Sequence, residues 1–238
     1  RRKNEVKDLS SVKSLTFDLF GTILDLGGSL IPYINRFLDA HGAQLSGDKF
    51  WAQWRARQRI EQYQDTIMSL GHSGYLATVR RALVYTLHLN DIEPTNDLVS
   101  KLMSAWRELS PFPEVLPALE KLANRYKLVV LSNGDPEFLD HLTENRVSYV
   151  FDYVFSVNIV GAFKPHPGVY LRAASILGLG THQCLMVSAN SFDIMGARAC
   201  GFRAVFVNRY QLPYEDTDYQ PDSIVSNFTQ LTEFLLSD

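Results

Sequence analysis

The segment Val12-Lys13-Ser14-Leu15-Thr16-Phe17-Asp18-Leu19-Phe20-Gly21-Thr22 is a short hydrophobic run that ends in a carboxylate and a glycine turn. This pattern predicts a buried strand that delivers Asp18 to a loop. In open α/β folds, ligands bind at the carboxyl ends of such strands. The residue two positions after Asp18 is Phe20 rather than a second acid, and this difference limits the reactions that Asp18 can support.

Composition bounds the class of protein. The chain has 238 residues, 46% of them hydrophobic, which suffices for one large domain or for a core with a small accessory domain. The net charge of −3 gives no strong field and argues against nucleic acid or a membrane surface as a partner. A reduced pair of cysteines, Cys184 and Cys200, fits a cytoplasmic protein. Residues 1–11 are polar and are expected to form a loose lead-in.

Strand and helix patterns alternate through most of the chain. Hydrophobic runs near 127–131, 152–157, 184–187, 204–207 and 224–225 alternate with helical patterns near 113–125, 135–146, 167–177 and 192–200, and Asn227 could cap a last helix. This order predicts an α/β fold with a doubly wound, parallel, Rossmann-like sheet.

A long helical stretch interrupts this alternation directly after the first strand. We expect helices that carry Leu30 to Leu38 (with Pro32 in the first turn), Phe50 to Trp54 (capped by Asp48), 73–89 and 95–109. The stretch therefore predicts a helical cap domain at 27–110, inserted into a catalytic core formed by 12–26 and 111–238.

Polar residues follow three of the predicted strands, and a lysine precedes a helix between the second and the last of them. In a parallel sheet these loops meet at one edge, so we expect a nucleophile, hydroxyl and amide donors, a cation and a second carboxylate to lie together. The candidates are Asp18, Thr22, Ser132, Asn133, Lys164, Ser188, Asn190 and Asp193. Each one alone has an ordinary structural interpretation, such as a helix-capping acid, a turn residue or a solvated lysine. Their order and spacing are more specific.

These segments resemble the motifs of the haloacid dehalogenase superfamily. The matching blocks are Phe17 to Thr22, Leu131 to Gly134, Phe163 to Pro165 and Ser188 to Asp193. Within the superfamily the chain is similar to the L-2-haloacid dehalogenases (the type II group), because Trp54-Arg55, Ser110-Pro111-Phe112, Lys164 to Tyr170 and Gly196 to Arg209 also match. The resemblance extends from about residue 13 to 235.

The resemblance implies a role for each site residue. Asp18 would attack carbon 2 of a 2-halocarboxylate with inversion and form an ester, while Lys164 would stabilise its charge. Asp193 would activate the water that hydrolyses the ester, with Ser188 and Asn190 positioning that water. Thr22 and Tyr170 would orient Asp18 and Lys164. Substrate contacts would come from Leu19, Phe20, Arg55, Ser132, Asn133 and Phe192, with Arg55 and Asn133 receiving the halide, although Arg57 and Arg59 are alternatives to Arg55. Relatives of this group are commonly homodimers, and Tyr75, Leu76, Val79 and Leu83 are candidates for the contact.

The residues themselves favour a dehalogenase over a phosphatase. A superfamily phosphatase needs an acid at the position of Phe20 to protonate its leaving alcohol, and an acid where Ser188 stands to help bind Mg²⁺. A halide leaves without a general acid, so a single aspartate nucleophile suffices. We therefore expect no metal and no cofactor; the six histidines are scattered without metal-ligand spacing.

Three positions depart from the dehalogenase pattern. The family commonly has Tyr at Phe20, Trp at Phe192 and Gln at Ala56. Pocket polarity and volume should therefore differ, which leaves the preferred substrate size and halogen open. Two alternatives also remain: the opening of a strained ring such as azetidine-2-carboxylate, for which no proton donor near Phe20 or Phe192 is obvious, and a non-catalytic binding protein that keeps the fold.

Overall fold

The computed structural model describes residues 9–69 and 71–237, so most of the polar lead-in lies outside the described residues. A six-stranded sheet has the order β5-β4-β1-β6-β7-β8, and every neighbouring pair is parallel. Its strands are β1 (Ser14–Phe17), β4 (Lys127–Ser132), β5 (Tyr153–Ser156), β6 (Cys184–Ser188), β7 (Arg203–Val207) and β8 (Ser223–Val225). The predicted doubly wound parallel sheet is confirmed, with β1 at its centre.

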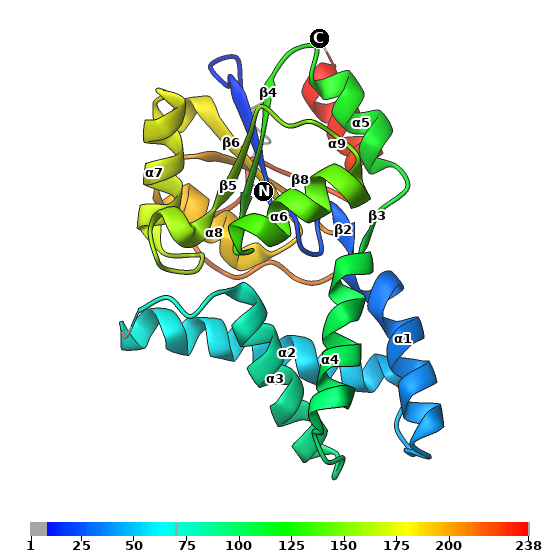
Figure 1. Cartoon of the computed structure of the whole chain (residues 1–238). Helices are drawn as coiled ribbons and strands as arrows, with labels where there is room; N and C mark the ends of the chain where they lie inside the picture. The colour runs from blue at the N-terminus through cyan, green and yellow to red at the C-terminus, as the bar shows by residue number, and fades with distance from the viewer. Residues whose placement is uncertain (1–8, 70, 238) are drawn as a thin grey trace.

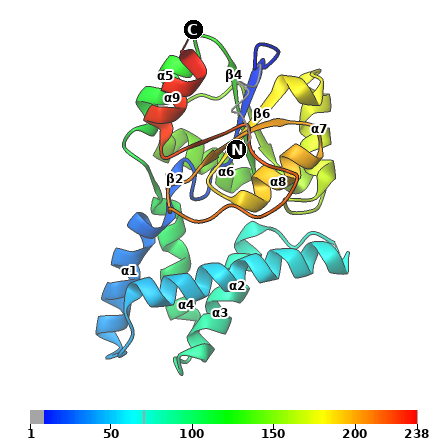
Figure 2. The same ribbon diagram turned by 180° about the vertical axis from the view of Figure 1, so that it is seen from behind.

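Helices cover both faces of this sheet. In Figures 1 and 2, α5 (Val115–Leu122) and α9 (Phe228–Leu236) lie together on one side, and α7 (Pro167–Leu177) and α8 (Ser191–Ala199) on the other. The short helix α6 (Pro136–Leu142) contacts β5. Two-sided cover explains why all four residues of β1 are buried, the polar Ser14 and Thr16 as well as Leu15 and Phe17.

The inserted helices form a second layer beneath one edge of the sheet (Figure 1). They are α1 (Leu26–Ala40), α2 (Gly47–Met68), α3 (Tyr75–Leu89) and α4 (Asn96–Ser104), which continues as a 3₁₀ turn at Ala105–Glu108. Where the chain leaves and re-enters the sheet layer, β2 (Leu24–Asp25) pairs antiparallel with β3 (Ser110–Pro111). In both ribbon views α2 crosses below the sheet, so its upper face meets the strand ends.

Large aromatic residues fill the interior of the helical layer. Trp54 and Trp106 are fully buried, and the Trp54 indole donates a hydrogen bond to the backbone oxygen of Val79 over 2.9 Å. Tyr75, Val79 and Leu83 are buried in the same interior. They therefore cannot form the subunit contact that the sequence led us to expect, because they are already packed within this chain.

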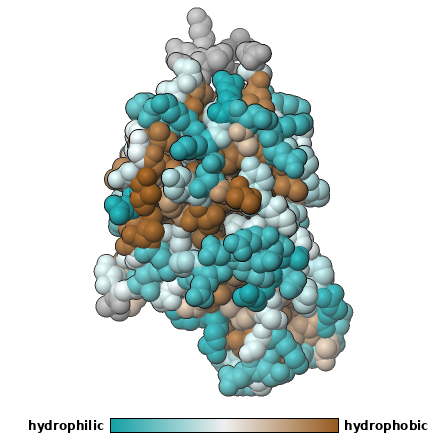
Figure 3. Space-filling model, turned by 45° about the horizontal axis from the view of Figure 1, so that its top comes forward, coloured by the Kyte–Doolittle hydropathy of each residue, from teal (hydrophilic) through white to brown (hydrophobic). Residues whose placement is uncertain are grey.

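In the view of Figure 3, the lower part of the surface is mainly hydrophilic, and hydrophobic residues gather further up.

Several helix boundaries differ from the sequence-based expectations. Asp25 caps α1 by accepting from the Gly28 amide, so Pro32 lies inside the helix rather than in its first turn. Ser46 caps α2, and Asp48 instead lies in the first turn, where a carboxylate favours the helix dipole.

Other features predicted from the sequence agree only in part with the structure. The helix predicted at 135–146 changes after Leu142 into a π-helical turn at Thr143–Val147. Asn227 caps α9 as predicted. Cys184 and Cys200 are free thiols, although only Cys184 is buried. No helix among residues 9–69 and 71–237 is long and apolar enough to cross a membrane.

Candidate active site

The Asp18 carboxylate lies just beyond the end of β1 and is held by side chains from three loops. Its Oδ2 accepts from the Thr22 hydroxyl over 2.7 Å and from the Asn190 amide over 2.8 Å. Its Oδ1 lies 3.3 Å from the Lys164 ammonium. The Thr22 hydroxyl in turn accepts from the Ala189 amide. Oδ2 is therefore fixed by two short hydrogen bonds, and Oδ1 is the less committed oxygen.

Lys164 joins Asp18 to the second carboxylate. Its ammonium lies 2.9 Å from Oδ2 of Asp193, and the Tyr170 hydroxyl donates to Oδ1 of Asp193 over 2.7 Å. All four side chains are buried, and Lys164 is only 2% exposed. This lysine is therefore not the solvated residue that its place before a proline would suggest, and the structure brings together Asp18, Lys164, Tyr170 and Asp193.

Burial and charge act against each other at this site. Burial raises the pKa of Asp193, and the Lys164 charge and the Tyr170 hydrogen bond only partly offset it. For Lys164, burial works to lower the pKa, but the charges of Asp193 and Asp18 outweigh it and the net pKa is raised. Burial next to Asp193 also places the pKa of Tyr170 well above its ordinary value. Lys164 therefore stays charged and Tyr170 stays neutral at physiological pH.

The remaining loop residues shape the backbone around these groups. The hydroxyl of Ser132 accepts from the Gly134 amide, and the hydroxyl of Ser188 accepts from the Asn190 amide. Asn133 Oδ1 accepts from the Lys164 backbone amide over 2.8 Å. All three side chains are buried at the carboxyl edge of the sheet, so the loops after β1, β4 and β6 meet as expected.

One face of α2 contributes polar groups to the site. Arg55 and Arg59 were candidates from the sequence, whereas Gln58 and Gln62 were not singled out there. Arg59 donates to Oδ1 of Asn190 over 2.8 Å, and Gln62 accepts from Asn133 over 3.4 Å. Arg55 donates to Gln58 over 3.0 Å and, among the described residues, makes no hydrogen bond to Asp18, Lys164 or Asp193. Arg57 pairs with Glu61 and does not join this face. The spacing of residues 55, 58, 59 and 62 places them on one side of a helix, which was the available signal.

Three positions that depart from the family pattern lie in different surroundings. Phe20 is buried and stacks on Tyr75 with ring centroids 4.3 Å apart. Phe192 is only partly buried and meets the ring of Tyr63 edge-on, with the Arg59 guanidinium 5.7 Å from its centre. Ala56 is exposed on the outer side of α2. Ala56 therefore does not line the site.

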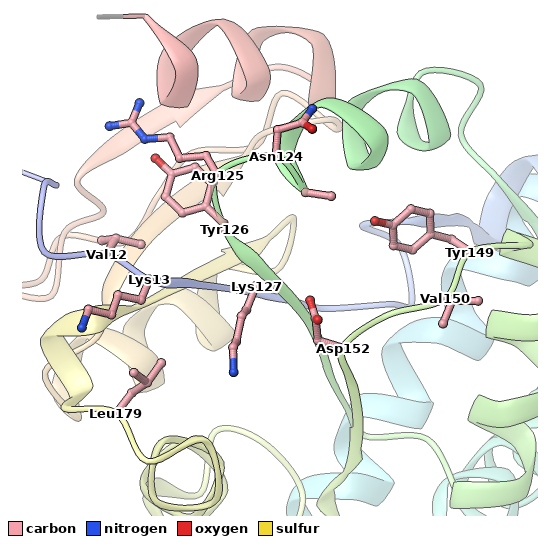
Figure 4. A pocket seen from close by; sticks show the side chains of 11 residues that line it. Val12, Lys13, Asn124, Arg125, Tyr126, Lys127, Tyr149, Val150, Asp152 and Leu179 are labelled. Carbon is pink, nitrogen blue, oxygen red and sulfur yellow. The ribbon is translucent and has the colours of Figure 1, made fainter.

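A cavity of about 200 Å³ opens beside the Asp18 group. Its polar wall is formed by Arg55, Arg59 and Asn190. The rest of the lining comes from Gly21, Leu26, Gly27, Trp51, Tyr210 and Leu212. Figure 4 shows another hollow, of about 570 Å³, lined by Lys13, Lys127 and Asp152 among others. It lies at the amino ends of β1 and β4, away from Asp18, so the smaller cavity is the one that belongs to this site.

The donor set does not suit a divalent metal ion. Both Asp18 and Asp193 already bind the Lys164 ammonium, and Ser188 contributes a hydroxyl where a hard cation would favour a further carboxylate. Within the described part of the chain, no group of three His, Cys, Asp or Glu side chains is placed to hold a metal.

A model of the haloacid dehalogenase-like hydrolase family matches residues 12–201. The chain belongs to this family. Its members include the (S)-2-haloacid dehalogenase 4A of Burkholderia cepacia, which is 32% identical over 209 residues covering 87% of each chain. The (S)-2-haloacid dehalogenase of Xanthobacter autotrophicus is 31% identical over 199 residues, covering 83% of this chain and 76% of that protein.

A solved structure of a family member extends the similarity to three dimensions. The L-2-haloacid dehalogenase of Xanthobacter autotrophicus with chloropropionic acid covalently bound superposes with a TM-score of 0.78 and 27% identity, covering 94% of this chain and 98% of that one. The haloacid dehalogenase fold therefore includes the inserted helices as well as the sheet.

Proposed function

We propose that the protein is a hydrolytic (S)-2-haloacid dehalogenase that converts (S)-2-haloalkanoic acids to (R)-2-hydroxyalkanoic acids. The observation that carries this proposal is the buried Asp18 carboxylate, oriented by Thr22 and Asn190 and neutralised by Lys164. A fixed, desolvated carboxylate next to a cation is suited to covalent catalysis on an activated saturated carbon. The names of the relatives support the same substrate class.

In the first step, Asp18 displaces the halide. An oxygen of its carboxylate, for which Oδ1 is the freer candidate, forms a bond to carbon 2 as the carbon–halogen bond breaks and its electron pair leaves with the halide. Attack from the side opposite the halogen inverts carbon 2. Before the reaction, the positive charge of Lys164 stabilises the ionised form of the Asp18 carboxylate. No general acid is needed, because a halide is a stable anion.

In the second step, water hydrolyses the ester. Asp193 takes a proton from water, and the resulting hydroxide adds to the Asp18 carbonyl carbon. The bond from that carbon to the oxygen that Asp18 gave to carbon 2 then breaks. The departing oxygen takes up the proton from Asp193, which restores the base, and the Asp18 carboxyl group loses its own proton to solvent. Lys164 and Tyr170 hold Asp193 in place for this role, and Ser188 and Asn190 position the water. A base whose pKa is raised above that of an ordinary aspartate is better matched to this proton transfer near neutral pH.

The substrate would lie between the sheet edge and the helices. Its carboxylate would be held by Ser132 and the backbone amides of Leu19 and Phe20, and its halide by Arg55 with Asn133. Phe20 and Phe192 would contact the alkyl group. Residues 27–110 would then act as a cap over the core of 12–26 and 111–238, closing on the substrate to exclude water.

Two alternative reactions fit the site less well. A phosphatase would need an acid at Phe20, but this side chain is buried among aromatic rings. Ring opening of an azetidine-type substrate would release an amine, yet the helix face opposite Asp18 carries guanidinium and amide donors. Donors and cations favour a leaving anion over a leaving ammonium group.

The direct test is halide release. Purified protein should release chloride from (S)-2-chloropropionate and leave the (R) enantiomer unreacted, with (R)-lactate as the product by chiral chromatography. Asp18→Asn should abolish the release. Ring opening of azetidine-2-carboxylate without any halide release would replace this proposal with the alternative. A homodimer is also proposed from the family resemblance, and multi-angle light scattering tests it.

A further inference from the structure

Several buried polar groups that face the site from the inserted helices have no acceptor. The Tyr75 hydroxyl, Nε2 of Gln58, Nε2 of Gln62 and Nε of Arg59 are all buried without a hydrogen-bond partner among the described residues. Burying an unpaired donor is costly, and native structures rarely keep several in one place. Their clustering therefore indicates that an acceptor-rich ligand occupies this place in the working enzyme.

Tyr75 is the most constrained of these groups. It is the first residue of α3, where its amide donates to Oδ1 of Asp135 and the Leu76 amide donates to Oδ2, each over 2.9 Å. Gly74 precedes it with φ of +94°, and a side chain there would collide with Asp135. The ring then stacks on Phe20 with only 11° between the planes. The hydroxyl is thus held rigidly beside the loop that carries Asp18.

The direction of the reaction places the leaving group on this side. A group displaced from the face opposite Asp18 departs away from the sheet, toward α2 and α3. Arg55 lies there with one guanidinium nitrogen on Gln58 and without an ion-pair partner in the described part of the chain. The Tyr75 hydroxyl is close enough to Arg55 and Gln58 for both to act on its pKa. It nevertheless makes no hydrogen bond of good geometry to either residue.

We propose that the leaving-group side of the site is adapted to fluoride, so that the protein hydrolyses 2-fluorocarboxylates with Tyr75, Gln58 and Arg55 donating hydrogen bonds to the departing fluoride. This inference rests on the proposed dehalogenase function. Fluoride is the smallest halide and the strongest hydrogen-bond acceptor, so charge that develops on it gains most from closely placed donors. The bond from Asp18 to carbon 2 forms while the carbon–fluorine bond breaks, and the electron pair leaves with fluoride.

Tyr75 acts here as a donor and keeps its proton. Burial raises its pKa to about 12, with the positive charge of Arg55 partly opposing that effect. The hydroxyl is therefore neutral at physiological pH. Phe20, on which the ring stacks, cannot supply this hydrogen bond itself because it lacks a hydroxyl.

Tyr75→Phe tests the proposal by removing one oxygen atom. We expect fluoride release from 2-fluoropropionate, followed with a fluoride electrode, to fall about 100-fold in kcat, as when one preorganised donor is lost. Bromide release from 2-bromopropionate should fall less than about tenfold, because bromide is a weaker acceptor. Tyr85→Phe is the matched control, since Tyr85 is on the same helix and 45% exposed, and both rates should match those of the parent.

Thermal unfolding of the ligand-free variants separates this role from a structural one. Deleting an unpaired buried hydroxyl should leave the melting temperature of Tyr75→Phe equal to or above that of the parent. A lower melting temperature, or equal fractional losses with both substrates, would overturn the inference. A parent enzyme that releases bromide but no fluoride would overturn it while leaving the dehalogenase function intact, whereas a parent inactive on every 2-haloacid would refute both.

Discussion

Replacing Lys164 by methionine should destabilise the protein strongly, because two buried carboxylates then lose their common cation. The Lys164 ammonium lies 3.3 Å from Asp18 and 2.9 Å from Asp193. At an effective dielectric constant of about 20, these contacts correspond to about 5 and 6 kcal/mol of Coulomb energy before desolvation. Desolvation of the ammonium offsets most of this gain, and removing one partner of a buried ion pair typically costs about 3–5 kcal/mol. We expect a loss of that size for Lys164→Met.

Urea denaturation at pH 7 measures this loss. Lys127→Met is the control, because Lys127 is exposed at the start of β4, and its unfolding free energy should change by less than about 0.5 kcal/mol. Adding Asp193→Asn to Lys164→Met removes one of the two unpaired charges and should restore part of the stability. A loss below about 1 kcal/mol for Lys164→Met, or a further loss in the double variant, would show that Lys164 is not the counter-ion of both carboxylates.

Three other variants give independent checks. Tyr170→Phe removes a hydrogen bond that lowers the pKa of Asp193; because Asp193 must be ionised to act as a base, the acidic limb of the pH–kcat profile should move to higher pH, and a downward shift would count against that role. Thr22→Val leaves the Ala189 amide without its acceptor and should lower the unfolding free energy by about 1–3 kcal/mol in denaturant titrations. Pro32→Ala should raise it by about 1–3 kcal/mol without changing activity, because Pro32 is inside α1 and exposed; a destabilised variant would contradict this.

The sheet and the groups at its edge could be predicted because a parallel topology places the ends of all its strands at the same edge. Once strands alternate with helices, polar residues that follow β1, β4 and β6 must meet. The sequence therefore predicted that Asp18, Asn133 and Asn190 lie close together, and the hydrogen bonds of Asn133 and Asn190 confirm it. The lysine was harder to place, since nothing local distinguishes a buried Lys164 from a solvated one. Only the two carboxylates that contact it in three dimensions account for its burial.

The contribution of the inserted helices could not be predicted in the same way. The spacing of Arg55, Gln58, Arg59 and Gln62 indicates one polar helix face, but such a face is usually solvated. It becomes part of the site only because α2 crosses the strand ends. Tyr75 appeared to be an apolar contact residue for a second subunit, whereas its position is set by Asp135, which is distant in the sequence.

Oxygen-18 labelling during a single turnover shows whether Asp18 is the nucleophile. With enzyme in excess over (S)-2-chloropropionate in ¹⁸O-enriched water, peptide mass spectrometry should find a single heavy oxygen in the Asp18 carboxylate, while the lactate formed in that turnover carries none. This result follows if Asp18 gives its own oxygen to carbon 2 and water attacks the ester carbonyl. Labelled lactate together with an unlabelled protein would mean that water attacks carbon 2 itself, and would contradict the proposed mechanism.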